Sequence, residues 1–308
     1  MDERRAAAVR LILTIAALGA SLGAQAPSIP KAVSPVTVSQ TARAIAPGEL
    51  VLLTFSTAVP VSSMTGTAFG RPLALFAGDV AGSWHALVAI DLGIGPGRVP
   101  VTVEARMRDG TLTRVVHQLT VASKKFGVRR LRVPERFVTP PASAQARIAR
   151  EQKRLAEVYT ASADTRLWQG AFEPPTDGAP VSPFGVRSEY NGTQGSPHRG
   201  TDFAGATGAG VRAPGSGRVV LAEDLYYSGN TVIIDHGLSL FSVLMHLSRI
   251  DVQVGDRVSR GASVGAVGAT GRVTGPHLHW SVRLGAISVD PLSILHVTAE
   301  AGKPARPD

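Results

Sequence analysis

The chain has 308 residues, of which 44% are hydrophobic and 18% charged, and its formal net charge is +9 at pH 7. This length suits about two domains and is enough to bury a core without covalent cross-links. Because there is no cysteine, the sequence excludes disulfide scaffolds, thiol catalysis, iron–sulfur clusters and cysteine-linked lipid anchors. The positive charge predicts an anionic partner such as nucleic acid, anionic lipid or an acidic cell-wall polymer.

Residues 1–26 have the features of a secretory signal peptide. Arg4, Arg5 and Arg10 precede an apolar run at 11–18, and Ala24-Gln25-Ala26 offers a small-x-small cleavage site. The run is short for a membrane span, and no second run of spanning length follows. We therefore expect a periplasmic or secreted protein with no stable membrane span after cleavage; the alternative is a retained anchor.

Residues 33–123 alternate as short strands separated by turns. The clearest strands are expected at 36–40, 50–55, 86–90 and 99–103, and Pro47-Gly48 and Asp109-Gly110 are typical turn sequences. Short strands without helical periodicity favour an antiparallel β-sandwich of the immunoglobulin-like type. Such a fold carries no chemistry by itself.

Residues 124–171 are expected to form a basic linker with a helix. Prolines at 134, 140 and 141 indicate an extended segment, and Thr139 is expected to cap a helix that begins near Pro141. Apolar residues at 148, 155, 158 and 159 give this helix a narrow apolar seam.

The same segment carries most of the positive charge. Ten Lys and Arg residues and two Glu residues lie between Lys124 and Arg154, a net charge of +8. One interpretation is a solvated linker and helix; the other is an electrostatic contact of Lys124–Arg154 with an anionic envelope polymer. A nucleic-acid partner is disfavoured, because export is expected and no aromatic-interleaved basic motif accompanies the charge.

Residues 172–296 are glycine-rich and are predicted to form a second, all-β domain, followed by a tail at 297–308. Strands are expected at 219–222, 231–234, 240–245 and 279–283. The whole chain is therefore predicted to be mainly β.

Two clusters of histidine and aspartate in this domain suggest a metal site. His277 and His279 are two residues apart on a predicted strand, so both imidazoles point to one face. His198 and Asp202 are expected on one face of an extended segment, and they flank Gly200, whose missing side chain would let a metal approach the backbone. Taken alone, the first pair is as well explained by surface histidines and the second by an ordinary ion pair.

Together the clusters match a catalytic zinc site. His198, Asp202 and one histidine of the second pair would give three protein ligands and leave a fourth position open. The other histidine would then be free for proton transfer.

Five motifs occur in the order found in one enzyme family. They are SPFGVR at 182–187, His198-x-x-x-Asp202, VIIDHG at 232–237, HL at 246–247 and GPHLH at 275–279. Over about residues 180–293 the chain resembles the lysostaphin/LytM-type zinc metalloendopeptidases, which cleave peptide cross-links of bacterial peptidoglycan. The turns at 254–258 and 265–271 also resemble the family. In place of the tyrosine usual two residues before the catalytic histidine, the chain has Leu244.

The resemblance implies a role for each motif residue. His198, Asp202 and His279 would bind one zinc ion per chain. His277 would act as general base on the attacking water, and His246 would stabilise the oxyanion or assist proton transfer. The substrate implied is the peptidoglycan stem peptide. His236 is expected to be structural, because a single histidine at a strand end usually makes a turn hydrogen bond.

The main alternative is a non-catalytic LytM-like protein that binds the cell wall and activates amidases. Such proteins lack metal ligands, whereas all three ligand positions are filled here. A thermolysin-like peptidase is disfavoured because the sequence has no His-Glu-x-x-His motif.

Overall fold

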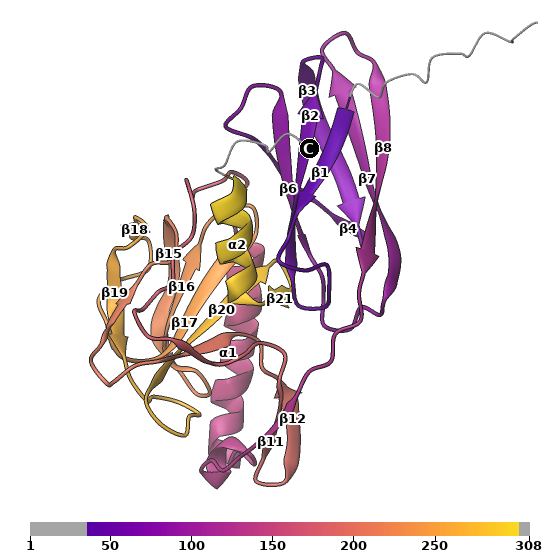
Figure 1. Cartoon of the computed structure of the whole chain (residues 1–308). Helices are drawn as coiled ribbons and strands as arrows, with labels where there is room; N and C mark the ends of the chain where they lie inside the picture. The colour runs from indigo at the N-terminus through magenta and orange to yellow at the C-terminus, as the bar shows by residue number, and fades with distance from the viewer. Residues whose placement is uncertain (1–35, 302–308) are drawn as a thin grey trace, which may run out of the picture. The chain divides into compact units, whose positions relative to one another are not determined.

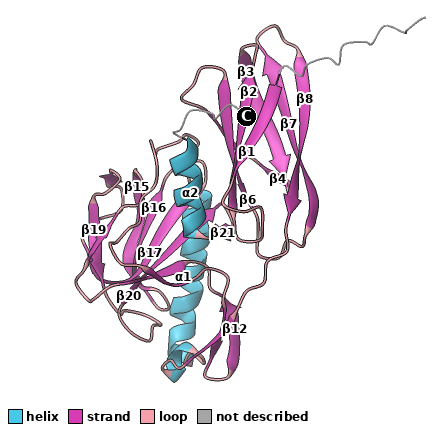
Figure 2. Ribbon diagram, viewed as in Figure 1, coloured by secondary structure: helices cyan, strands magenta, loops and turns pink. Residues whose placement is uncertain are grey.

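The computed structural model describes residues 36–301, so the predicted signal peptide lies outside the described residues. Within this range the fold is mainly β, as predicted, with two α-helices, α1 (Ala142–Thr160) and α2 (Pro291–Ala301) (Figure 2). No helix in the described range combines the length and apolar character needed to cross a membrane.

The N-terminal part consists of two four-stranded antiparallel sheets. One sheet has the order β1 (Val36–Thr41), β2 (Leu50–Thr57), β6 (Ser83–Ala89) and β5 (Ala74–Ala77). The other has the order β4 (Arg71–Pro72), β3 (Val61–Ala68), β7 (Gly97–Met107) and β8 (Leu112–Val121). A single core of buried residues from both sheets joins them as a sandwich. The four strands expected from the sequence fall in β1, β2, β6 and β7, while the immunoglobulin-like topology stays a prediction.

Strand β2 is buried on both faces. Successive side chains of a strand point to opposite sides, and Val51, Leu53 and Phe55 join the sandwich core. Leu50 and Leu52 instead join a second core that also contains residues of the C-terminal sheet. A strand buried on both sides needs a continuous apolar run, which explains the Leu-Val-Leu-Leu sequence at 50–53.

The C-terminal sheet has ten strands (Figure 1). Its main path runs β10 (Pro180–Ser182), β13 (Thr201–Ala204), β20 (His277–Leu284), β17 (Leu240–Ile250), β16 (Gly229–Asp235), β15 (Gly217–Leu225) and β18 (Arg257–Val258). Strand β19 (Ser263–Val267) pairs with β17 and with β14 (Gly210–Arg212), and β21 (Ile287–Val289) pairs with β20. Helix α2 follows β21, whereas the sequence analysis expects no helix after the last strand.

The basic segment at 124–171 is built into the structure. Its strand β9 (Val128–Leu131) pairs in parallel with β11 (Arg187–Tyr190). Strand β11 also pairs with β12 (Thr193–Pro197). A 3-10 turn, η1 (Glu135–Phe137), follows β9. Helix α1 then packs its predicted apolar seam, at Leu155, Val158 and Tyr159, against a buried cluster of β15, β16 and β17. The domain boundaries at 123 and 171 stay a prediction.

The start of α1 differs from the sequence-based expectation. Thr139 makes no cap, because its hydroxyl donates a hydrogen bond to Glu135 Oε1 at 3.1 Å. Pro141 is the N-cap residue and offers no side-chain hydrogen bond. Its fixed backbone angle still suits the first turn of a helix.

Candidate active site

Strand pairing brings the predicted ligand residues together. In the antiparallel register of β13 and β20, Asp202 lies directly opposite His279, and Ala204 lies opposite His277. His198 comes from the turn between β12 and β13, so the sheet supplies two donors and the preceding loop the third. The sequence analysis expects His198 and Asp202 on one extended segment, but only Asp202 lies in a strand.

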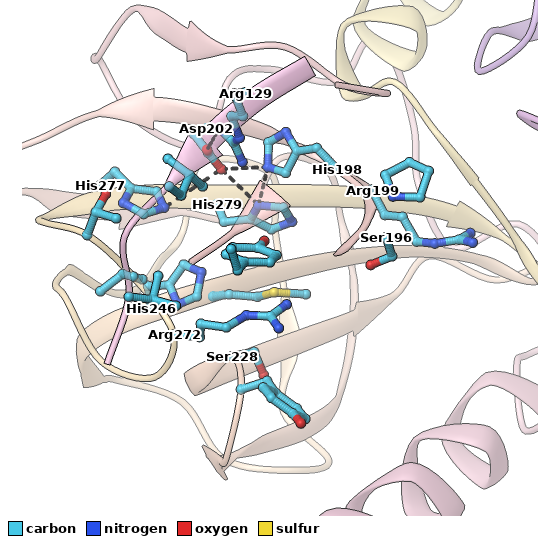
Figure 3. Close-up of a pocket in the computed structure, with 18 residues that line it drawn as sticks. Arg129, Ser196, His198, Arg199, Asp202, Ser228, His246, Arg272, His277 and His279 are labelled. Carbon is cyan, nitrogen blue, oxygen red and sulfur yellow. Dashed lines mark hydrogen bonds and ion pairs between the residues drawn. The ribbon is translucent and has the colours of Figure 1, made fainter. Parts of the chain in front are cut away.

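Three donor atoms from these residues form a small triangle (Figure 3). His198 Nε2 lies 2.9 Å from Asp202 Oδ1 and 3.0 Å from His279 Nδ1, and the distance from His279 Nδ1 to Asp202 Oδ1 is 2.8 Å. All three side chains are buried. In a tetrahedral zinc site with bonds near 2.0–2.1 Å, neighbouring donors lie about 3.3 Å apart. The triangle therefore has nearly the size of one face of such a site.

Protons alone cannot satisfy this triangle. Each ring nitrogen carries either one proton or one lone pair, so the three contacts cannot all be two-centre hydrogen bonds. His198 Nδ1 lies 3.0 Å from the carbonyl oxygen of Pro183, to which it can only donate. In the neutral ring this leaves a lone pair on His198 Nε2, aimed at a carboxylate and at a second nitrogen. A cation bound by the three atoms removes the conflict, so the donor set fits a metal ion.

The environment of Asp202 keeps it ionised. Burial by itself would raise the pKa of this carboxyl, but the adjacent imidazoles of His198 and His279 hold the pKa well below its usual range. Burial also lowers the pKa of His279, which favours the neutral imidazole that a metal requires.

Gly200 makes room for the ring of His279. A Cβ atom at this position would lie 2.5 Å from His279 Nε2 and 2.5 Å from the carbonyl oxygen of Trp280. The sequence analysis explains this glycine by close approach of a metal to the backbone. The contact in the structure is instead with the ring and backbone of β20.

The other two predicted site histidines flank the triangle. The rings of His246 and His277 have centroids 5.1 Å apart, and the centroids of His246 and His279 are 6.0 Å apart. His277 Nε2 lies 3.7 Å from Asp202 Oδ1. All five site residues predicted from the sequence thus line one cavity of about 290 Å³.

Backbone carbonyls fix the orientation of both flanking rings. His277 Nδ1 donates to the carbonyl of Gly275 at 2.8 Å, and His246 Nδ1 donates to that of Thr270 at 2.9 Å. In their neutral forms both rings therefore have the lone pair on Nε2, ready to accept a proton.

A bulge in β17 positions His246. The register of β17 against β16 shifts in this region, and His246 has a φ of 65°, which is uncommon for a residue with a side chain. Its backbone N–H donates to the carbonyl of Ser228 at 2.9 Å. Burial lowers the pKa of His246 to about 3, and the neighbouring histidines add to this effect. His246 is therefore neutral at pH 7.

Arg129 and Arg272 are site residues that the sequence analysis misses. Arg129 Nη1 lies 3.4 Å from Asp202 Oδ2, and its Nε donates to Ser188 Oγ at 3.1 Å. Arg129 belongs to the run that the sequence analysis treats as a linker. Arg272 directly follows the family-like turn at 265–271, and that position is the only signal for it in the sequence.

Most of the Lys and Arg residues in the basic segment form ion pairs within the protein. Six of its ten Lys and Arg residues have a carboxylate partner within 4.0 Å: Lys124, Arg129, Arg130, Arg147, Lys153 and Arg154. Together with the pairing of β9 and the packing of α1, these pairs differ from the solvated linker of the first interpretation. Contact with an anionic envelope polymer stays a prediction.

The four histidines that were not predicted as site residues lie apart from the cavity. His236 is fully buried, with Nδ1 2.9 Å from the carbonyl of Ser216 and Nε2 2.9 Å from Ser242 Oγ. These contacts agree with the structural role predicted for it. His85, His117 and His296 do not line the cavity either.

The fold and the cavity define a class of protein. Two imidazoles and one carboxylate that converge on one point, with further histidines beside them, are typical of metal-dependent hydrolases. The model of Peptidase family M23 matches residues 196–291, which include all five predicted site residues. The chain belongs to this family, which confirms the resemblance seen in the sequence.

Known relatives agree with this assignment. A crystal structure of an M23-family protein from Pseudomonas aeruginosa is 31% identical and superimposes with a TM-score of 0.62, covering 83% of this chain and 96% of that one. The chain is 48% identical over 87 residues to peptidoglycan DD-endopeptidase ShyA of Vibrio cholerae, and 36% identical over 119 residues to DD-carboxypeptidase/endopeptidase Mpg of Neisseria gonorrhoeae. These matches span only 20% of ShyA and 27% of Mpg.

Proposed function

We propose that the protein is a zinc-dependent endopeptidase that hydrolyses peptide cross-links of bacterial peptidoglycan. The observation that carries this proposal is the buried triangle of His198, Asp202 and His279 inside the region matched by the M23 family. The names of the relatives ShyA and Mpg support peptidoglycan peptides as the substrate. A periplasmic or secreted location follows from that substrate.

The three donors would hold the zinc ion, and two histidines would handle the protons. When bound, zinc supplies Lewis acidity, which lowers the pKa of a water molecule and polarises the scissile carbonyl. His277 Nε2 has a lone pair that faces the site and would accept the proton of the attacking water.

His246 is better suited to proton transfer than to stabilising an oxyanion in its neutral form. Its proton is on Nδ1, bound to the carbonyl of Thr270, so Nε2 can accept a proton but has none to donate. Once protonated on Nε2 by the reaction, the ring could stabilise negative charge or protonate the leaving amine. Of the two roles considered for His246, this geometry favours proton transfer.

Paired variants test the proposal. His279→Ala is expected to lose zinc, whereas His277→Ala should retain about one zinc per chain and lose hydrolysis. Zinc content is measured on the purified proteins, and hydrolysis as new amino termini and muropeptide masses released from sacculi. If the wild-type protein binds zinc but releases no new amino termini from any sacculus, the endopeptidase proposal is refuted and the amidase-activator alternative is favoured. At present nothing in the site or the relatives supports that alternative.

A further inference from the structure

The cavity around the candidate metal site has an excess of positive charge. Three arginines line it: Arg129, Arg199 and Arg272. Among the described residues that line it, Asp202 is the only acidic one, and its two oxygens already face the histidines and Arg129. A cavity with this balance attracts an anionic ligand.

Among the three arginines that line the cavity, Arg272 is the one whose guanidinium packs against aromatic rings. Its guanidinium carbon lies 4.5 Å from the ring centroid of Tyr190 and 4.9 Å from that of Tyr227. Within residues 36–301 its guanidinium makes these two cation–π contacts and no hydrogen bond or ion pair. By contrast, Arg129 contacts a carboxylate and two serine hydroxyls.

The backbone of Arg272 is held firmly beside the catalytic histidines. Its N–H donates to the carbonyl of Tyr227 at 2.8 Å. Gly271 has a φ of 75°, and a Cβ there would lie 2.4 Å from the backbone nitrogen of Gly229, so the two loops are in close contact. Two residues earlier, the carbonyl of Thr270 accepts the hydrogen bond from His246. Figure 3 shows Arg272 beside His246 in the cavity.

An arginine held in this way is prepared to bind a carboxylate. Aromatic rings against the guanidinium restrict its rotamers and leave its N–H groups available at the edge. These groups match a carboxylate in two parallel hydrogen bonds. Since the side chain is already ordered, less entropy is lost when the ligand binds.

We infer that Arg272, held between Tyr190 and Tyr227, is a specificity-determining residue that binds a carboxylate of the substrate peptide. The inference rests on the proposed function, because it takes the ligand to be a peptidoglycan cross-link. When the cross-link joins D-alanine to diaminopimelate, the carbon that bears the scissile amide nitrogen also carries a carboxylate. A glycine bridge has none at that position. Arg272 therefore favours the first kind of cross-link.

Two matched substrates test this contact. One is a synthetic peptide dimer joined by D-alanyl–diaminopimelate with a free carboxylate beside the scissile amide, and the other is its carboxamide twin. The wild-type enzyme should cleave the free acid with a kcat/KM about 10- to 100-fold higher than that of the carboxamide. Arg272→Gln should reduce this ratio to about one, mainly by raising KM for the free acid. Arg257→Gln, at the exposed position of strand β18, is the control and should leave the ratio unchanged.

Binding gives a readout that does not depend on turnover. By titration calorimetry, metal-free wild-type protein should bind the free acid at least about tenfold more tightly than the carboxamide, and Arg272→Gln should bind both equally. An equal ratio in wild type and Arg272→Gln, in both assays, overturns the inference while leaving the proposed function intact. Failure of the wild type to cleave either dimer or sacculi would instead overturn the proposed function, and the binding ratio would still decide the contact.

Discussion

Replacing Arg129 by glutamine is expected to weaken metal binding without unfolding the protein. Arg129 Nη1 is the ion-pair partner of Asp202 Oδ2, while Asp202 Oδ1 faces the two ligand histidines. The guanidinium thus fixes the orientation of the carboxylate from its outer side. Arg129 acts here through Asp202, which makes it a positioning residue.

The size of the effect follows from the exposure of this pair. Loss of a partner behind a metal ligand typically costs about 10- to 100-fold in metal affinity, or about 1.4 to 2.7 kcal/mol. The side chain of Arg129 is 26% exposed, so solvent screens part of its interaction with Asp202. We therefore expect a loss near the lower end, about tenfold.

A neighbouring arginine provides the control. Arg130 is next to Arg129 on β9, points to the other side of the strand and is 82% exposed, and it pairs with Glu189. Zinc affinity would be measured at neutral pH by competition with a chelating dye for wild type, Arg129→Gln and Arg130→Gln. Thermal unfolding of the metal-free proteins checks that both variants fold.

The comparison has a clear negative result. If Arg129→Gln binds zinc as tightly as Arg130→Gln, the contact with Asp202 does not position the ligand. Equal losses in both variants would point to a general disturbance of strand β9, because removing a positive charge by itself would raise the affinity for a cation. Neither result is compatible with the reasoning above.

Three further predictions concern the same domain. Gly200→Ala should lower zinc affinity and reduce the unfolding free energy by about 1–3 kcal/mol, because the new Cβ would press on His279 and on the backbone of β20. The control is Gly210→Ala, where a Cβ meets nothing within 4 Å, and it should change neither quantity. Burial lowers the pKa of His236 to about 4, so its contribution to stability is complete above the unfolded value near 6.5 and is lost as the pH falls toward 4. Urea unfolding at pH 7 and 4.5 should show a smaller pH-dependent loss in His236→Gln than in wild type, and equal losses would contradict this assignment. Chelation of the metal should lower Tm in wild type but not in His279→Ala, since only a folded site that binds zinc is stabilised by it; an unchanged wild-type Tm would argue against the site.

Much of the candidate site is determined by the sequence alone. Residues two apart on a strand must share a face, so the spacing of His277 and His279 already places both rings on one side of the sheet. The order of the motifs then identifies the family, and with it His198, Asp202 and His246. The alternation of apolar residues likewise predicts the main strands of both β-rich parts.

Only the tertiary structure decides how distant residues complete the site. Arg129 and Asp202 are 73 residues apart, and nothing in a run of basic residues distinguishes an arginine paired with a buried carboxylate from one in solvent. In the same way, strand β2 serves two cores because the other sheet of the sandwich covers one of its faces and helix α2 contacts it on the other side.

Arg272 shows the same limit most clearly. Its neighbours Tyr190 and Tyr227 belong to a hairpin and a turn that the sequence separates by 37 residues, and only the folded sheet brings both against one guanidinium. The difference has a physical reason. The arrangement of the ligands at the centre of the site depends on residues of neighbouring paired strands, which the sequence pattern places. The charge and shape of the surrounding cavity come from loops, whose positions depend on the packing of the whole domain.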